Sequence, residues 1–185
     1  MSAEIGATEV VSLSSARGLA GLHNRVSHSV PPLNFAMVSP GVFRSGYPNP
    51  RNFPFLSSLR LKTIIHLGHE DYLAENAQFA SDHGIQVLRI PVPGNLEPFV
   101  SMSDASICEA LQAMLDENNQ PVLVHCNKGK YRTGCVVGCY RKLFSWSLTS
   151  IFEEYRRHAE HGGGGVRLLD QQCIELFDFR AHAVL

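Results

Sequence analysis

A cysteine and an arginine enclose five residues in the segment VHCNKGKYRTG at 124–134, and this spacing is suited to chemistry on phosphate. Cys126 opens the segment, Arg132 closes it, and Thr133 follows the arginine directly. A thiolate is a strong nucleophile, and the planar fork of an arginine holds two oxygens of a phosphoryl group at once. The pattern predicts that Cys126 attacks bound phosphate covalently, while Arg132 holds the oxygens and Thr133 donates to the departing sulfur.

The elements on either side of this segment are expected to aim the cysteine. The run at 121–124, PVLV, is typical of a buried strand, and the run at 135–144 is typical of a buried helix. In a strand–loop–helix unit the loop N–H groups converge on one point, where the helix dipole favours negative charge. His125 is expected to point away from the substrate and to brace the loop. The predicted substrate-binding residues are Asn127, Lys128, Gly129, Lys130, Tyr131 and Arg132.

The same segment carries a resemblance to a known family. HCNKGKYRTG resembles the signature of the protein-tyrosine and dual-specificity phosphatases. From about Pro31 to Phe179 the chain resembles their plant and fungal atypical branch, through PPLNFAMVSPGVFRSGYP, NLEPFV, the run from NQPVLVHC to EEYRRHA, and LDQQCIELFD. Members of that branch include a yeast enzyme that acts on inositol pyrophosphates. The resemblance implies a compact α/β domain, a phosphocysteine intermediate, and no metal or organic cofactor.

Four places depart from the pattern that this branch commonly shows. Leu96 stands where a basic residue is common, Lys128 where an arginine is common, and Tyr131 where a histidine is common. The run HGGGG at 161–165 replaces a more basic connection and is typical of a flexible link between two helices, with a substrate-gating role as the alternative. These departures bear on how the substrate is bound and leave the predicted nucleophile and arginine intact.

The charge of the loop bears on the substrate. Lys128 and Lys130 lie between the predicted nucleophile and Arg132. Two ammonium groups beside a bound phosphate attract ligands that carry further phosphates, whereas a single phosphotyrosine does not need them. Charge alone leaves open an inositol pyrophosphate, a phosphoprotein and a phosphoinositide lipid, and the resemblance favours the first. A phosphate-binding module without activity is a further alternative, against which the intact catalytic residues argue.

The general acid is the least regular part of the pattern. Related phosphatases donate a proton to the leaving group from an aspartate roughly thirty residues before the cysteine. Here no aspartate lies between His83 and Ser103. We predict Glu97 in that role, with Glu70 and Asp71 as alternatives. A pyrophosphate is a better leaving group than an alkoxide and needs less help from an acid, so the missing aspartate agrees with a phosphoanhydride substrate.

Composition describes one globular domain. The chain has 185 residues, of which 44% are hydrophobic, enough for one sizeable core. Its net charge of −1 gives no general attraction to nucleic acid or membranes, so anion recognition must be local. No membrane anchor or secretory signal is evident. The five cysteines follow no disulfide or zinc spacing, which favours a reducing compartment; we expect the cytoplasm, with the nucleus as the alternative.

The remaining patterns predict a mobile leader at 1–30 and a phosphatase domain at 31–185. Strands are expected at 35–38, 42–44, 62–67, 85–90 and 121–124, the first two as a hairpin. Helices are expected at 71–83, 103–118, 133–144, 148–160 and 170–180. Such alternation favours an α/β fold with a central, mostly parallel sheet flanked by helices. The active site is then expected at the C-terminal edge of that sheet.

Overall fold

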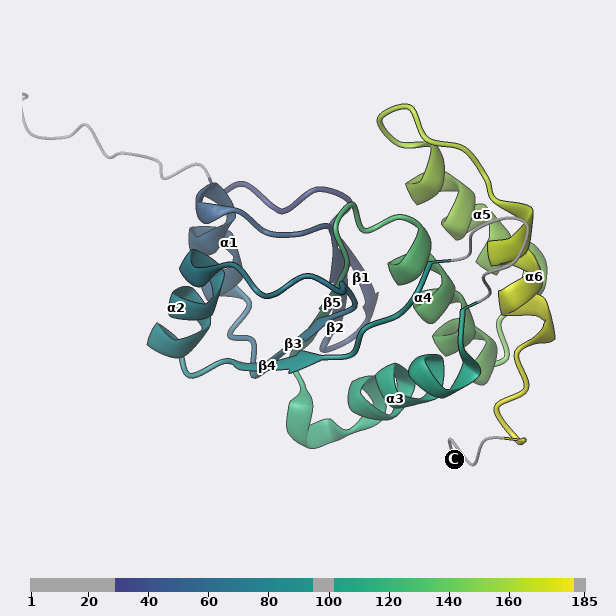
Figure 1. The fold of residues 1–185 in the computed structure, drawn as a ribbon, viewed down its shortest axis with the longest axis horizontal. Helices are drawn as coiled ribbons and strands as arrows, with labels where there is room; N and C mark the ends of the chain where they lie inside the picture. The colour runs from purple at the N-terminus through teal and green to yellow at the C-terminus, as the bar shows by residue number, and fades with distance from the viewer. Residues whose placement is uncertain (1–28, 95–101, 182–185) are drawn as a thin grey trace, which may run out of the picture.

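The structure is a computed structural model that describes residues 29–94 and 102–181. Within these ranges one sheet contains five strands in the order β1-β2-β5-β3-β4 (Figure 1). The strands are β1 (Ala36–Ser39), β2 (Val42–Ser45), β3 (Thr63–His66), β4 (Gln86–Arg89) and β5 (Val122–His125). β1 pairs antiparallel with β2, and all the other pairings are parallel. The predicted α/β fold with a mostly parallel sheet is confirmed.

Helices lie on both sides of this sheet (Figure 1). α1 (Phe53–Ser58), preceded by a 3-10 turn at Pro50–Asn52, and α2 (Ala74–Asp82) cover one face. The other face is covered by α3 (Asp104–Leu115), α4 (Tyr131–Leu143), α5 (Leu148–Glu160) and α6 (Leu168–Leu176), and a second 3-10 turn follows α3 at Glu117–Asn119. α4 packs against the other three helices of its layer and is therefore the central helix of that side.

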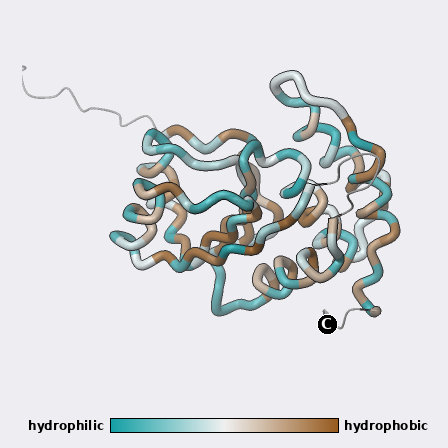
Figure 2. The backbone as a smooth tube through the Cα atoms, in the orientation of Figure 1, coloured by the Kyte–Doolittle hydropathy of each residue, from teal (hydrophilic) through white to brown (hydrophobic). Residues whose placement is uncertain are grey.

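Side chains of the central strands alternate between two apolar clusters, as the pleat of a strand requires. Val42 and Val124 pack with the layer of α3 to α6, whereas Phe43 and Leu123 pack with α1 and α2. Because β2, β3 and β5 are buried on both faces, they are mostly apolar (brown at the centre of Figure 2), apart from Thr63 at the start of β3 and the residues towards the carboxyl ends. Except for Thr63, the polar residues of these strands therefore gather at one edge of the sheet.

The helix predicted to start at Asp71 begins at Ala74 instead. Asp71 pairs with Arg89 of β4 at 2.8 Å, and the Leu73 N–H donates to the Tyr47 hydroxyl at 2.9 Å. These contacts hold the segment after β3 outside the helix, although its sequence fits one. Tertiary contacts thus override the local preference here.

Some predictions fall on residues outside the described ranges, namely Leu96, Glu97 and most of the leader. Among the residues that are described, none of the helices combines the length and the apolar character needed to cross a membrane. The same part of the chain holds no group of three or more His, Cys, Asp and Glu side chains arranged to hold a metal ion.

Candidate active site

Cys126 lies at the carboxyl end of β5, the middle strand of the sheet. All four residues of β5 are buried, and Cys126, which follows them directly, is 3% exposed. β5 pairs with β2 on one side and with β3 on the other. α4 then begins at Tyr131. The strand–loop–helix unit expected from the sequence is present, and it holds the cysteine at the C-terminal edge of the sheet.

Hydrogen bonds hold three successive carbonyls of the phosphate loop, by which we mean residues 126–132. The donors come from the chain around β2, and the pairs are Tyr47 N–H to the Asn127 carbonyl, Asn34 Nδ2 to the Lys128 carbonyl, and Arg44 Nη2 to the Gly129 carbonyl, each at 2.8 Å. In a trans peptide the N–H group points opposite to the carbonyl. The N–H groups of residues 128–130 therefore point to the other side of the loop, where they form a cradle for an anion.

Gly129 is required by its position in this loop. Its φ is +65°, in the left-handed region that favours glycine. A Cβ at this position would lie 2.5 Å from the Gly46 nitrogen and from the Ser45 carbonyl oxygen. The absence of a side chain thus lets the phosphate loop lie directly on the backbone that follows β2.

Arg132 and Thr133 occupy the first turn of α4. Arg132 is partly exposed, and its Nη1 donates to the Leu67 carbonyl at 3.3 Å, so its guanidinium lies at the edge of the sheet. The Thr133 hydroxyl is buried and has no hydrogen-bond partner among the described residues. Buried hydroxyls normally have a partner. A buried hydroxyl without a hydrogen-bond partner is available to donate to a group that becomes charged during a reaction.

The two lysines of the phosphate loop have different surroundings. Lys128 is exposed, whereas Lys130 is 5% exposed. A Cβ on Gly164 would lie 2.7 Å from the Lys130 Nζ. The Arg167 guanidinium lies over the ring of Tyr131, 3.5 Å from its centre. The connection between α5 and α6 therefore packs on the phosphate loop as well as linking two helices. Of the two lysines, Lys128 is the one whose side chain is accessible to a ligand from solvent.

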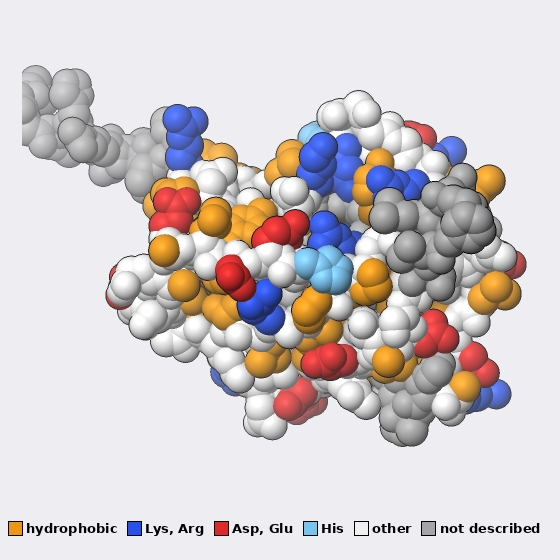
Figure 3. Space-filling model, in the orientation of Figure 1, with side chains coloured by type: hydrophobic (Ala, Val, Ile, Leu, Met, Phe, Trp, Pro, Cys, Tyr) orange, Lys and Arg blue, Asp and Glu red, His pale blue; other side chains and the backbone are white. Residues whose placement is uncertain are grey.

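Positive side chains gather on the face of the molecule that carries the β5–α4 junction. Figure 3 shows Lys and Arg side chains grouped over this junction and towards the α5–α6 connection. Asp and Glu side chains on the same face lie mainly nearer to α2 and α3. Although the whole chain has a net charge of −1, this grouping of positive side chains attracts anions locally, as the predicted phosphate chemistry requires.

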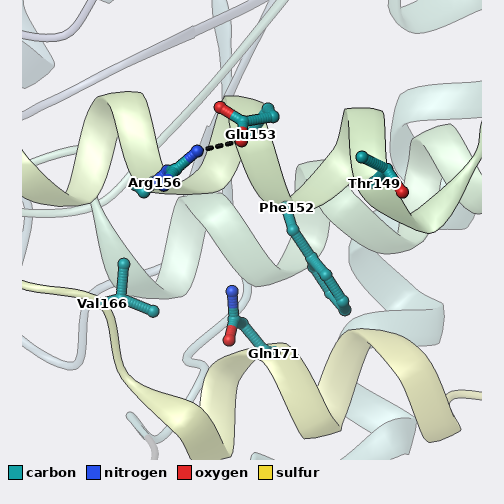
Figure 4. A pocket seen from close by; sticks show the side chains of 6 residues that line it. All are labelled: Thr149, Phe152, Glu153, Arg156, Val166 and Gln171. Atoms are coloured by element: carbon teal, nitrogen blue, oxygen red, sulfur yellow. Dashed lines mark hydrogen bonds and ion pairs between the residues drawn. The ribbon is translucent and has the colours of Figure 1, made fainter.

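A pocket of about 390 Å³ lies between α5 and α6 (Figure 4). Phe152 points from α5 towards α6, and Gln171 reaches back from α6. On the α5 side Arg156 pairs with Glu153. None of the described residues that line this pocket belongs to the phosphate loop, so it is separate from the candidate active site.

Two histidines and two tyrosines pack together beside the cysteine. The rings of His66 and His125 are stacked with their centres 5.0 Å apart, and Tyr47 meets both edge-on at 5.4 and 5.1 Å. The Tyr72 hydroxyl lies 3.4 Å from His125 Nε2. Burial lowers the pKa of His125 to about 3, with a smaller contribution from His66, and burial also lowers the pKa of His66. His125 is thus neutral near pH 7 and supports the loop from behind.

Arg44 and Glu154, which no local pattern in the sequence marks as functional, meet beneath the phosphate loop. Arg44 on β2 is 1% exposed, and its Nη1 lies 3.4 Å from Glu154 Oε1 on α5. The other oxygen of the same carboxylate pairs with Arg141 on α4. One signal was available in the sequence, since a charged residue within the apolar run of a buried strand must find a partner.

Neither Glu70 nor Asp71, the two alternatives to Glu97, is suited to the role of general acid. Glu97 lies outside them and stays a prediction. Asp71 is paired with Arg89 and exposed. A hydrogen bond from its own N–H, followed by the charges of Arg132 and nearby histidines, lowers the pKa of Glu70. Because Glu70 is therefore ionised at neutral pH, it is a poor proton donor.

The construction of this loop defines the class of protein, a phosphatase that uses a cysteine. Similarity to known proteins then gives the family. A model described as the tyrosine phosphatase family matches residues 29–183. The chain belongs to that family, and the predicted membership and phosphatase activity are confirmed.

Individual relatives are similar in both sequence and structure. The chain is 54% identical over 149 residues to inositol diphosphatase DSP4 from Arabidopsis thaliana, covering 80% of this chain and 74% of the relative. It is 47% identical over 150 residues to inositol diphosphatase SIW14 from Saccharomyces cerevisiae, covering 80% of this chain and 52% of the relative. The crystal structure of the core catalytic domain of PP-IP phosphatase SIW14 in complex with citrate matches with a TM-score of 0.77 and 44% identity, over 83% of this chain and 90% of that one.

Proposed function

We propose that the protein hydrolyses the β-phosphate of inositol pyrophosphates through a phosphocysteine intermediate on Cys126. The observation that carries this proposal is the phosphate loop itself, whose carbonyls are held by the protein and whose rim bears the exposed Lys128 near Arg132. A cradle with an additional cation at its rim suits a ligand with several phosphates. The similarity to proteins named inositol diphosphatases supports the same substrate class.

The proposed reaction has two steps. Cys126 attacks the terminal phosphorus in line with the bond that breaks, while Arg132 and the N–H groups of residues 127–132 hold the equatorial oxygens. The bond from that phosphorus to the bridging oxygen breaks, and the inositol phosphate leaves with the electron pair. Water then attacks the phosphocysteine and breaks its sulfur–phosphorus bond, while Thr133 donates to the departing sulfur.

The leaving group determines how much acid catalysis this reaction needs. Glu97 is the proposed proton donor for an ester, whose leaving oxygen becomes an alkoxide. A phosphoanhydride releases a phosphate group that is stable as an anion, so we expect a smaller contribution from Glu97. The proposed reaction uses no metal ion or organic cofactor.

Comparing phosphate release from three substrates tests this function. The substrates are 5-diphosphoinositol pentakisphosphate, a phosphotyrosine peptide and a phosphoinositide in vesicles, with Cys126→Ser as the control. We expect the highest kcat/KM on the pyrophosphate and no turnover in the control. A preference for the peptide would indicate a protein phosphatase, and a preference for the vesicles a phosphoinositide phosphatase. Turnover by Cys126→Ser would contradict the covalent mechanism.

Replacing Lys128 tests the basis of substrate choice. Lys128→Ala is expected to lower kcat/KM for the pyrophosphate about tenfold, because one charged contact to a phosphate is lost. Turnover of 4-nitrophenyl phosphate is expected to change much less, since that ligand has one phosphate. Lys62→Ala is the matched control, because it removes the same charge from an exposed position before β3, at the opposite edge of the sheet. Equal losses on both substrates would contradict the role of Lys128.

We also propose that the enzyme acts in the cytoplasm. Its five cysteines all lie in the described part of the chain, and none of them forms a disulfide there. A chain with several cysteines and no disulfide is typical of a reducing compartment. Imaging a tagged chain in cells tests this proposal.

A further inference from the structure

Arg44 projects from β2 into the protein beneath the phosphate loop. It pairs in register with Val124 of β5, close to Cys126 in the chain. The two ends of its guanidinium have different partners, because Nη2 donates to the Gly129 carbonyl at 2.8 Å while Nη1 lies 3.4 Å from Glu154 Oε1. A planar guanidinium holds two partners in fixed directions, which the ammonium group of a lysine cannot do. Arg44 therefore fixes the direction of one loop peptide relative to α5.

The direction of the Gly129 carbonyl matters for anion binding. Gly129 precedes Lys130, and the two share one peptide unit whose N–H points opposite to the carbonyl. By holding the carbonyl on the protein side, Arg44 keeps the Lys130 N–H on the cradle side. A donor that is already oriented stabilises charge in a transition state without the cost of reorganisation.

The buried charges beneath the loop do not cancel. Arg44 and Arg141 each carry a positive charge, and both pair with the single carboxylate of Glu154. His158 contacts the Glu154 carbonyl through Nδ1 at 2.9 Å, and burial lowers the pKa of His158, so it adds no charge near pH 7. The group therefore has one positive charge in excess. Such an excess is costly in a buried place unless an anion lies nearby.

The Cys126 sulfur is placed to supply that anion. Burial lowers the pKa of Arg44, and the Glu154 carboxylate and the Cys126 sulfur both oppose this shift. Arg44 is in register with Val124, and Val124 and Cys126 belong to the same buried cluster on one face of the sheet, so the guanidinium and the sulfur lie on the same side of β5. A thiolate at Cys126 balances the excess charge, and the charge in turn favours the thiolate.

We propose that Arg44 is a positioning residue of the phosphatase reaction, which orients the loop N–H groups through the Gly129 carbonyl and favours the thiolate of Cys126 through its charge. The inference rests on the proposed role of Cys126 as the nucleophile and does not depend on which phosphorylated compound is the substrate. 4-Nitrophenyl phosphate is therefore a suitable probe.

Two substitutions separate the two contributions of Arg44. Arg44→Lys keeps the charge but loses the planar guanidinium that holds two partners, so we expect kcat to fall about tenfold. The pH dependence of Cys126 alkylation by iodoacetamide is expected to stay as in the wild type. Arg44→Met loses both the charge and the fixed geometry, so we expect kcat to fall about a hundredfold and the midpoint of alkylation to move to higher pH. Mass spectrometry of the alkylated peptide identifies Cys126 as the reacting cysteine.

Arg141→Met is the matched control. Arg141 pairs with the same carboxylate, and its guanidinium lies 4.0 Å from the centre of the Trp146 ring. We expect Arg141→Met to lower thermal stability and to leave kcat near that of the wild type, because the contact between Arg44 and the Gly129 carbonyl is retained. Its alkylation midpoint is expected to move less than that of Arg44→Met, because Arg44, the guanidinium that contacts the loop, keeps its charge. The other charged and titratable groups around the loop, unchanged in all three variants, include His66, Glu70, His125, Lys128, Lys130, Arg132, Glu154, His158 and Arg167.

Several results would overturn the inference. If Arg44→Met had the kcat and the alkylation midpoint of the wild type, Arg44 would neither orient the loop nor favour the thiolate. Equal effects of Arg44→Met and Arg141→Met on kcat and alkylation would show that the network acts only through folding. The same conclusion would follow if both Arg44 variants failed to fold while Arg141→Met folded. Turnover by Cys126→Ser is a different outcome, since it would contradict the proposed function itself.

Discussion

The two faces of the sheet beneath the phosphate loop differ in whether the buried polar side chains of their strands are charged. On the side of α4 and α5, Arg44 and Arg141 stay charged because each pairs with Glu154. On the side of α1 and α2, His66 and His125 are kept neutral, since burial lowers the pKa of both. Burial tolerates a charge where a carboxylate pairs with it directly and disfavours it where no such pair forms.

This difference gives the loop a defined polarity. The charged face places positive groups under the loop, where they attract an anion. The neutral face supports the same loop by ring packing, with His125 stacked on His66 and flanked by Tyr47. Because each face acts by a different physical means, each is disturbed by a different change.

The largest effect on stability is expected from neutralising the carboxylate of the charged face. Glu154→Gln leaves two buried guanidiniums without an anion between them, so we expect the free energy of unfolding to fall by about 3–5 kcal/mol. Urea unfolding measures this change. Glu153→Gln is the matched control, because the neighbouring Glu153–Arg156 pair is about half exposed and is expected to contribute less than about 1 kcal/mol. Similar costs for the two variants would show that the charged face is not held by pairing.

A smaller effect is expected where the loop meets the chain after β2. Gly129→Ala combines a left-handed φ with a Cβ 2.5 Å from backbone atoms, so we expect a cost of about 3 kcal/mol and a loss of activity. Gly84→Ala is the control, because Gly84 has a φ of +64° and no heavy atom within 4 Å of the added Cβ. It is expected to cost only about 1 kcal/mol. Equal costs would mean that backbone conformation alone, and not the close approach, requires Gly129.

The smallest effect concerns the neutral face and appears as a pH dependence. His125 has a pKa of about 3 in the fold and its ordinary value of 6.5 when unfolded, so between these values the unfolded chain binds more protons. The stability that this histidine supports is complete above pH 6.5 and falls as the pH is lowered. We expect a loss of about 2 kcal/mol between pH 7 and pH 5.

Denaturant unfolding at a series of pH values measures that loss. His125→Asn should show a shallower dependence on pH, whereas His69→Asn, at an exposed position, should retain the wild-type slope. Burial lowers the pKa of His66 and His158 too, so part of the slope should persist in His125→Asn. An unchanged slope in His125→Asn would show that this face does not exclude charge.

Much of the site could be read from local spacing. The order of apolar strand, loop and helix around Cys126 was predicted with the correct placement at the edge of the sheet, because all of its parts are adjacent in the chain. The surroundings of Lys130 show a limit of this approach. Spacing gives no difference between Lys128 and Lys130, whereas the fold exposes Lys128 and buries Lys130 beside Gly164; the substrate-binding role of Lys130 stays a prediction. The start of α2 was missed for a similar reason, since Asp71 and Leu73 have partners elsewhere in the chain.

The sequence by itself determined the class of chemistry, because Cys126, Arg132 and Thr133 lie within one loop and one helical turn, and a local motif carries its own geometry. It also determined the alternation that produces a mostly parallel sheet. Only the tertiary structure decided what supports the loop. Arg44, Arg141 and Glu154 come from β2, α4 and α5, and His66 meets His125 across two strands. Such contacts depend on how distant elements pack, which no local spacing records.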